Sequence, residues 1–459
     1  MADPFPILTA VEMRAVEQGA IETGTSVDTL MERAGAAVAE TAWRAEGRIQ
    51  TLVLCGPGNN GGDAYVAARL LRERGVPVRI AISAPPSTEA AGRAAGGWAG
   101  PTEAIAEARS APLVIDGLFG TGLTRSLEPG LGNCLGRLVT GARRRIAIDL
   151  PSGVASDSGA LLGPVPSFDL TVALGTLKPA HRLLPSAGLC GRVVIADIGL
   201  GPIEAHPAFS ITKPSLFGPS HDANKYSRGK LVVIAGSMSG AGLLAAMAGQ
   251  RSGAGYVELL GGDRSEGPHA LVHRTWSNRA LEDDRIGAIV VGPGLGLDKA
   301  GRAKLDAALG SGKRLLLDAD ALTLIGKARH DRLAGHVLTP HWGEFVRLFG
   351  DSGRDRLAQV RDAAARCNAI ILLKGADSIV AHPDGRVAIA PLAPTWLASA
   401  GTGDVLAGII GSLIAGGRSG FDAAQAGLWL HAEAARMAGP ALIADDLPNH
   451  LPAAIAACL

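Results

Sequence analysis

The sequence has few aromatic residues, few cysteines and almost no net charge. Phe, Trp and Tyr make up 4% of the 459 residues while hydrophobic residues make up 47%, so any core must be built from aliphatic side chains and alanine. That much apolar surface excludes a disordered chain, which cannot offset the entropy lost on folding. The 62 glycines suit many tight turns between short buried strands.

The five cysteines do not form any Cys-x-x-Cys pair. They are scattered through the sequence at Cys55, Cys134, Cys190, Cys367 and Cys458. Disulfide frameworks and zinc sites both need paired or closely spaced cysteines, so the spacing excludes both as organising features.

Neither sign of charge is in excess, with 44 Lys and Arg against 43 Asp and Glu. Proteins that bind polyanions usually carry a basic excess or stripe, so we expect no nucleic-acid partner. The N-terminus has no basic segment followed by an apolar stretch, so we expect no signal peptide. Apolar runs such as 405–415 contain glycine and fall short of the ~20 residues that a bilayer requires. We therefore expect a cytoplasmic protein with no membrane partner.

Short aliphatic runs alternate with helix-period stretches along the whole chain, which predicts stacked βα units and largely parallel sheets. The expected strands of the first half span 51–55, 76–82, 112–116, 145–149, 170–174 and 192–197. Those of the second half span 230–236, 256–260, 288–292, 314–318, 336–339 and 369–373, followed by a hairpin over 380–389. Helices are expected within 10–46 and at 63–74, 402–415, 422–438 and the C-terminus. The proline-rich stretch 201–230 is the expected linker, so we predict two α/β domains, 1–210 and 220–459.

A glycine-rich turn at 56–63, Gly-Pro-Gly-Asn-Asn-Gly-Gly-Asp, lies between a predicted strand and a helix whose N-cap we place at Asp63. Gly61 and Gly62 permit positive φ and close approach of a ligand to the backbone, and the helix N-terminus favours a phosphate. The neighbouring Asn60 can hold a cation without adding charge. The alternative is a glycine-rich turn with no ligand.

Two more acidic segments, 116–122 and 149–153, follow predicted strands. In an open parallel sheet the ligand crevice lies at the carboxyl ends of the strands. The side chains expected at this rim are those of Asn60, Asp116, Asp149 and Ser152. Each aspartate could instead only cap its own turn.

In the second half, the segment 401–408, Gly-Thr-Gly-Asp-Val-Leu-Ala-Gly, opens a helix, with Asp404 in its first turn. Backbone N–H groups there form an anion hole, and a carboxylate beside a bound phosphate can take the proton of an attacking hydroxyl. The segment 374–378 places a lysine and amides where nucleotide phosphates could lie. Asp404 alone could be an acidic cap and His341 a structural histidine, while Asp318 and Asp320 could cap the next helix.

The motifs of the first half, in this order, resemble the NAD(P)H-hydrate epimerase family, known as the YjeF N-terminal domain, over about 1–205. The resemblance implies a Rossmann-like three-layer αβα domain that interconverts R and S hydrates of NAD(P)H. It implies substrate contacts at Asn59, Asn60, Gly61, Gly62, Asp63, Gly120, Thr121, Gly122, Leu123, Thr124, Arg125, Ser126 and Asp149. It implies a potassium ion on Asn60, Asp116 and Ser152. We expect Asp149 to be the acid–base group, because epimerisation at C6 requires proton movement near a hydroxylated ring.

The second half, from about 225 to 459, resembles the ADP-dependent NAD(P)H-hydrate dehydratases, a branch of the ribokinase-like αβα superfamily. The strings that carry this resemblance lie at 251–255, 292–296, 338–344, 373–378 and 401–408. The implied hydrate contacts are Ala241, Gly294, Gly296, His341 and Asp404. The implied ADP contacts are Lys374, Gly375, Ala376, Asp377, Ser378 and Gly403, with magnesium accompanying the nucleotide. The loop 236–241 is about two residues shorter than in the family, and this difference affects the assignment of Ala241 as a hydrate contact.

Together the resemblances imply a bifunctional, homo-oligomeric enzyme that acts on NAD(P)H hydrates and ADP. The dehydratase would phosphorylate the C6 hydroxyl and eliminate phosphate, with Asp404 as catalytic base, and the epimerase would supply it with the S form. The alternative is a ribokinase-like small-molecule kinase with a non-catalytic N-terminal interaction module. A stable phosphorylated product would indicate that alternative.

Overall fold

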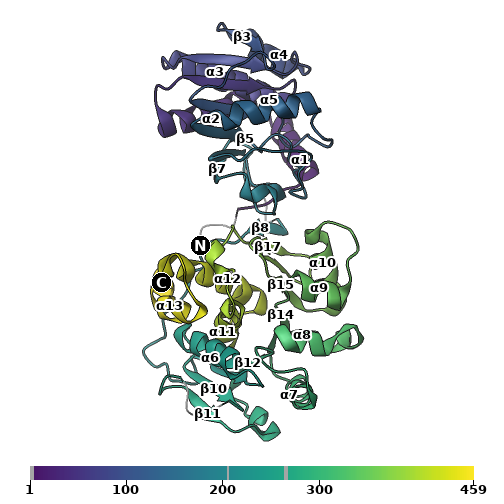
Figure 1. Cartoon of the computed structure of the whole chain (residues 1–459), viewed down its shortest axis with the longest axis vertical. Helices are drawn as coiled ribbons and strands as arrows, with labels where there is room; N and C mark the ends of the chain where they lie inside the picture. The colour runs from purple at the N-terminus through teal and green to yellow at the C-terminus, as the bar shows by residue number, and fades with distance from the viewer. Residues whose placement is uncertain (1–4, 204–205, 263–266) are drawn as a thin grey trace. The chain divides into compact units, whose positions relative to one another are not determined.

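The computed structural model of the chain describes residues 5–203, 206–262 and 267–459. It divides the chain into two compact units, Phe5–Ser210 and Ile211–Leu459, each drawn as a separate body in Figure 1. The division falls within the proline-rich stretch 201–230. None of the helices in these described ranges is both long enough and apolar enough to cross a bilayer.

The N-terminal unit is built around a parallel sheet with the strand order β3-β2-β1-β4-β5-β6-β7. Its strands are β1 (Thr51–Cys55), β2 (Val78–Ile82), β3 (Thr102–Ala104), β4 (Leu113–Gly117), β5 (Arg144–Ile148), β6 (Leu170–Leu174) and β7 (Arg192–Ala196), and a short strand β8 (Ala208–Ser210) ends the unit. Its helices are α1 (Ala10–Glu22), α2 (Val27–Glu46), α3 (Asn59–Glu73), α4 (Glu89–Gly96) and α5 (Pro129–Thr140).

Alternating side chains of the central strands face two separate helix layers. Val53 and Cys55 of β1 pack in one buried cluster with residues of α2 and α3. Leu52 and Leu54 point the other way and pack with Leu138 of α5. Every residue of β1 is buried, as expected for a central strand covered on both faces. The unit is therefore a three-layer αβα sandwich, which confirms the predicted fold class.

The C-terminal unit has the strand order β11-β10-β9-β12-β13-β14-β15-β16-β17, parallel up to β15 and antiparallel from there to β17. The strands are β9 (Lys230–Ile234), β10 (Tyr256–Leu260), β11 (Val272–Arg274), β12 (Ile286–Val291), β13 (Leu315–Leu317), β14 (Val337–Leu338), β15 (Ile370–Leu373), β16 (Ile379–Ala381) and β17 (Val387–Ile389). The helices are α6 (Ser239–Arg251), α7 (Lys299–Gly310), α8 (Ala319–Ile325), α9 (Trp342–Phe349), α10 (Arg356–Cys367), α11 (Thr402–Ala415), α12 (Gly420–Ala438) and α13 (Leu447–Ala456).

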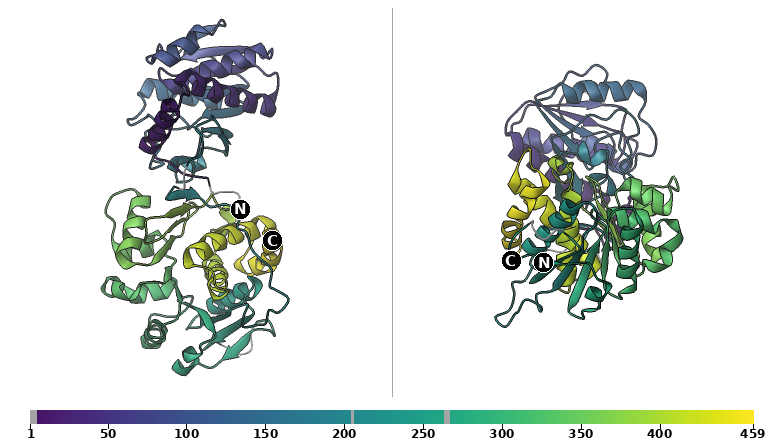
Figure 2. Two further views of the ribbon diagram at one scale, coloured as in Figure 1. Left: turned by 180° about the vertical axis from the view of Figure 1, so that it is seen from behind. Right: turned by 60° about the horizontal axis from the view of Figure 1, so that its bottom comes forward.

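Helices cover both faces of this second sheet. Figures 1 and 2 show α6, α11, α12 and α13 gathered on one face and α7 to α10 on the other. The antiparallel pair β16–β17 confirms the predicted hairpin. The loops that follow β9, β12, β13, β14 and β15 leave the same edge of the parallel part of the sheet.

The glycine-rich turn of the N-terminal unit differs from the prediction at two points. Helix α3 begins at Asn59, and its N-cap is Gly58, five residues before the predicted cap at Asp63. Gly61 and Gly62 could adopt positive φ, but neither does so in the structure. Glycine is needed there for close packing, because a Cβ on Gly61 would lie 1.9 Å from the carbonyl oxygen of Gly56. The cap rule misplaced the start of α3 because Gly58 caps it without any side-chain hydrogen bond.

Candidate active sites

A cavity of about 520 Å³ lies at the carboxyl ends of the strands of the N-terminal unit. Its walls come from α1 and α2, the start of α3, and the loops after β1, β4, β5 and β6. Of the predicted substrate contacts, it is lined by Asn59, Asn60, Asp63, Gly120, Thr121, Gly122, Leu123 and Asp149. Gly61 and Gly62 lie inside α3 and pack against protein, and Thr124, Arg125 and Ser126 are outside the lining.

Asp149 forms a buried ion pair with Lys178 in this cavity. Lys178 Nζ lies 2.5 Å from Asp149 Oδ1 and also donates to the carbonyl oxygens of Leu174 at 2.7 Å and Thr176 at 3.2 Å. Three acceptors for one amine match the three protons of an ammonium group. All three donors of the Lys178 amine are thus engaged within the protein, and one of them fixes the position of Asp149 Oδ1.

The backbone of Asp149 is in the left-handed region, with φ of 62°. Its N–H donates to the carbonyl of Val172 at 2.8 Å, and its own carbonyl lies 2.6 Å from His181 Nε2. Because His181 Nδ1 accepts the backbone N–H of Lys178, Nε2 must carry the ring proton and donate to Asp149. Burial lowers the pKa of His181 to about 4. His181 is thus a neutral support for the Asp149 turn.

Two other carboxyl groups line the same cavity. Asp63 is 7% exposed, and its side chain makes no hydrogen bond within the described ranges. Burial, with the nearby carboxylates of Asp149 and Glu17, holds the pKa of Asp63 well above its ordinary range, and Lys178 only partly offsets this. Burial also raises the pKa of Glu17, on α1. The cavity therefore contains carboxyl groups in very different environments.

Asp116 and Ser152 lie behind the cavity wall and are fully buried. The Asp116 carboxylate accepts from Ser152 N at 2.9 Å, from Ser152 Oγ at 2.8 Å and from Leu118 N at 3.1 Å. Burial nevertheless raises the pKa of Asp116 to about 6, and these hydrogen bonds offset only part of that shift. The pair ties the loop after β4 to the loop after β5.

Gly120 brings Asn60 and Asp149 to one point on the cavity wall. A Cβ at position 120 would lie 3.1 Å from Asn60 Oδ1 and 3.2 Å from Asp149 Oδ2. The amide nitrogen of Asn60 is buried and has no hydrogen-bond partner in the described part of the chain. Polar oxygens therefore converge beside a residue that has no side chain.

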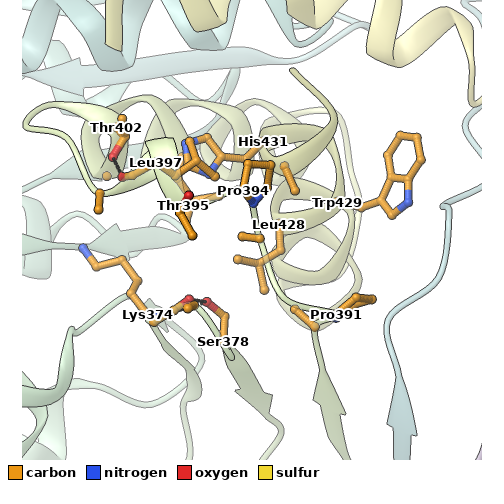
Figure 3. A pocket seen from close by; sticks show the side chains of 18 of the residues that line it. Lys374, Ser378, Pro391, Pro394, Thr395, Leu397, Thr402, Leu428, Trp429 and His431 are labelled. Atoms are coloured by element: carbon orange, nitrogen blue, oxygen red, sulfur yellow. Dashed lines mark hydrogen bonds between the residues drawn. The ribbon is translucent and has the colours of Figure 1, made fainter. Parts of the chain in front are cut away.

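The C-terminal unit has a cavity of about 490 Å³ between the end of β15, the segment 390–398, and helices α11 and α12. Figure 3 shows Lys374 and Ser378 on one side of it and Thr402, Leu397 and His431 on the other. Of the predicted ADP contacts, this cavity is lined by Lys374, Gly375, Ala376, Ser378 and Gly403. Asp377 is instead buried in an ion pair with Arg356, outside the lining.

Lys374 is held by Asp318, with Nζ 2.5 Å from Oδ1. Burial alone would lower the pKa of Lys374, but Asp318, Glu344 and Asp404 together raise it above its usual value. Asp404 lies in the first turn of α11, after Gly401 in the left-handed conformation. Burial and the charge of Asp318 raise the pKa of Asp404 to about 7, while Lys374 acts in the opposite direction. An aspartate that titrates near neutrality is suited to proton transfer.

The predicted hydrate contacts occupy neighbouring loops. Gly294 has φ of 60°, and a Cβ there would lie 3.0 Å from the Cβ of Ala241, so these two residues face each other. Gly296 donates its N–H to Asp320 Oδ2 at 2.8 Å. His341 caps α9, because Nδ1 accepts from Gly343 N at 3.0 Å; its side chain is 55% exposed, and Nε2 lies 3.6 Å from Glu344 Oε1.

Three residues of these sites were missed from the sequence. Lys178 and Asp318 are far along the chain from Asp149 and Lys374, and no local pattern indicates either pairing. His431, on α12, lines the second cavity with its buried Nε2 unpartnered among the residues that are described. Burial lowers its pKa to about 4, so it is a neutral acceptor or donor in the cavity wall.

Comparisons with known proteins match both units. Residues 231–456 match the family model described as NAD(P)H-hydrate dehydratase, and residues 27–180 match the one described as YjeF-related protein N-terminus. A bifunctional NAD(P)H-hydrate repair enzyme Nnr of Mycobacterium tuberculosis is 37% identical over 80% of this chain and 79% of its own length. One of Escherichia coli is 33% identical over 97% of this chain and 93% of its own length.

A solved structure supports the fold of the C-terminal unit. A ribokinase-like superfamily protein from Enterococcus faecalis is 22% identical, with a TM-score of 0.50, and covers 56% of this chain and 98% of that protein. At this identity the similarity concerns the fold alone.

Proposed function

This chain belongs to the family of bifunctional NAD(P)H-hydrate repair enzymes, and we propose that each of its two units performs one of the two reactions. The N-terminal unit epimerises R and S NAD(P)H hydrate, and the C-terminal unit dehydrates the S form with ADP as phosphoryl donor. The observation that carries this division is that each unit has its own cavity beside a buried aspartate–lysine ion pair.

In the C-terminal unit, Asp404 takes the proton of the C6 hydroxyl while the phosphoryl group is transferred to its oxygen. Hydroxide is a poor leaving group, so phosphorylation is what permits the later elimination of phosphate. The backbone N–H groups at 401–403, at the start of α11, stabilise the negative charge of the transferring group. A pKa of about 7 for Asp404 gives it basic strength and a large ionised fraction at neutral pH.

The binding residues of this unit follow from the lining. Lys374, Gly375, Ala376, Ser378 and Gly403 contact ADP, and Asp377 contributes by fixing the loop through Arg356. The hydrate lies against Ala241, Gly294, Gly296 and His341. Magnesium would neutralise the phosphates, and the carboxylates of Asp318 and Asp320, which interact with Asp404, are hard oxygen donors of the kind it prefers.

In the N-terminal unit, Asp149 is the acid–base group, supported by its place in the lining and by the unoccupied Oδ2 that faces Gly120. Asn59, Asn60, Asp63 and the segment 120–123 contact the hydrate. The residues at 124–126 complete this loop at the rim.

Potassium fits the residues behind this wall. Asp116 is a fully buried carboxylate, and burial raises its pKa. No cationic side chain is bonded to it in the described ranges. A monovalent cation held by Asn60, Asp116 and Ser152 would balance that charge and fix the loops after β1, β4 and β5 in place. Its chemistry is electrostatic, and the proton transfers belong to protein side chains.

The remaining parts of the proposal concern the whole molecule. We expect a homo-oligomer of the cytoplasm that binds neither nucleic acid nor membranes, with an epimerase domain over 1–210 and a dehydratase domain over 220–459. Light scattering of the purified protein tests the oligomeric state.

The central test follows absorbance at 340 nm with mixed NADH hydrates, ADP, magnesium and potassium. Wild type should regenerate all of the hydrate as NADH, Asp149→Ala only the S share, and Asp404→Ala none. No recovery by wild type, together with a stable phosphorylated product, would instead establish a small-molecule kinase.

A further inference from the structure

We propose that Asp63 and Asp149 divide the proton transfers of epimerisation, Asp63 giving a proton and Asp149 taking one, while Lys178 is the positioning residue that holds Asp149 through its Oδ1. The inference rests on the proposed epimerase function of the N-terminal unit. Its basis is the contrast between two carboxyl groups that line one cavity, one unpartnered and one paired with a lysine.

Asp63 is in the environment of a neutral acid. It is more than nine-tenths buried, lines the cavity from the second turn of α3, and its carboxyl makes no hydrogen bond to any residue that the structure describes. A buried carboxylate without a partner is strongly disfavoured, so the group remains protonated instead. Burial accordingly holds the pKa of Asp63 well above its ordinary range. A protonated carboxyl in contact with the cavity can donate.

Asp149 is in the environment of a base. Its Oδ1 accepts from the Lys178 ammonium at 2.5 Å and from Leu174 N at 3.2 Å. Its Oδ2 has no hydrogen-bond partner among the described residues and faces the cavity beside Gly120. Since the three protons of Lys178 are all donated, this lysine can neither accept a proton nor reach the substrate as a base.

The other charged groups around Asp63 do not reverse this contrast. Helix α1 contributes Glu17, whose negative charge disfavours ionisation of Asp63, and Arg14 at the cavity lining. Helix α2 contributes only the apolar side chains of Val27, Leu30, Met31 and Ala34. Lys178 has a smaller effect on the pKa of Asp63 than burial, Asp149 or Glu17 has, and it is already paired with Asp149. Two carboxyls whose environments differ in this way are the usual arrangement of an acid and a base.

The proposed step balances as follows. Asp63 gives its proton to the C6 hydroxyl, the C6–O bond breaks with its electron pair on oxygen, and water leaves while the ring nitrogen lone pair forms a C6=N bond. A water molecule then adds to the opposite face of C6, Asp149 takes one of its protons, and the C6=N electron pair returns to nitrogen. The C6 configuration is inverted, no atom is oxidised, and proton exchange with solvent restores Asp63 and Asp149.

The test measures interconversion of separated R and S hydrates by chromatography, without ADP, as a function of pH. Wild type should lose kcat/KM on the alkaline side, where Asp63 ionises. Asp63→Asn should lower kcat about 10²- to 10⁴-fold, change KM little, and remove this alkaline limb. Lys178→Met should lower kcat with little change in KM and keep the alkaline limb, because Asp149 is no longer held in position while Asp63 is unchanged.

Glu73→Gln, at the exposed end of the same helix α3, is the matched control and should leave the profile unchanged. Circular dichroism and the thermal unfolding midpoint report that the N-terminal unit of each variant is folded, since dehydration belongs to the other unit. Wild type that fails to epimerise would overturn the proposed function itself. An active wild type with an Asp63→Asn variant that keeps its kcat or its alkaline limb would overturn only this inference. An unchanged kcat in folded Lys178→Met would overturn the role of the lysine.

Discussion

Asp318 Oδ1 lies 2.5 Å from Lys374 Nζ, and the two members of this ion pair shift the pKa of a third residue, Asp404, in opposite directions. The negative charge of Asp318 raises the pKa of Asp404, whereas the positive charge of Lys374 lowers it. The pKa of Asp404, the proposed base, therefore depends on an ion pair whose members can be removed one at a time.

The pH dependence of dehydration should follow Asp404. Its pKa is raised to about 7, so the ionised, proton-accepting form is in the minority below that pH and predominates above it. We expect kcat for pure S hydrate to rise through about pH 7 and then level off, as measured between pH 5.5 and 9 at saturating ADP. A rate already at its plateau at pH 5.5 would contradict this assignment.

Removing the members of the ion pair should move that midpoint in opposite directions. Asp318→Asn should shift it to lower pH and Lys374→Met to higher pH, because the two charges act on Asp404 with opposite sign. Asp362→Asn, in an exposed ion pair with Arg354, is the control and should leave the midpoint in place. Shifts of the same sign in both variants would show that the effect is not electrostatic.

Asp116 should make stability depend on pH and on potassium. Its pKa rises from 3.8 to about 6 on folding, so the folded state binds the proton more tightly than the unfolded state. The sign follows: stability falls as pH rises from about 4 to about 6, by about 3 kcal/mol at most, and stays lower above pH 6. We expect potassium to restore it at pH 7.5 but not at pH 4.5, measured as the thermal unfolding midpoint against a sodium reference. In Asp116→Asn the potassium effect should vanish.

A methyl group at position 120 should disable the epimerase alone. In Gly120→Ala the new Cβ would lie 3.1 Å from Asn60 Oδ1 and 3.2 Å from Asp149 Oδ2, so both side chains must give way. Epimerisation should fall by at least about tenfold, while dehydration of S hydrate is unchanged. Gly132→Ala, with nothing within 4 Å of the new atom, is the matched control. Equal losses in both variants would contradict the steric explanation.

Several strands could be predicted from the sequence, because a strand is a local pattern of residues. Strands 51–55, 170–174 and 256–260 occur at the predicted bounds, since buried aliphatic runs flanked by turns are unambiguous in a parallel sheet. Asp149 was placed as the last residue of its strand. It is instead the first residue after β5, where the backbone turns to φ of 62°.

The partners of the charged residues could not be predicted, because they depend on distance in space. Lys178 meets Asp149 across 29 residues and Lys374 meets Asp318 across 56. Asp318 lies at the start of α8, where a helix cap is the ordinary local interpretation, but its side chain makes no cap hydrogen bond and binds Lys374. Local sequence rules indicate which contacts a side chain such as Asp318 could make, and the packing of distant segments determines which contact it makes.

The division of the chain after Ser210, with a complete cavity on each side, also has a genetic consequence. Translation delivers the two catalysts in equal numbers, and it delivers them in a fixed order. A premature stop codon within the proline-rich stretch would leave the reading frame of the N-terminal unit intact. A cell with such an allele would go on exchanging one stereoisomer of the damaged coenzyme for the other while removing neither.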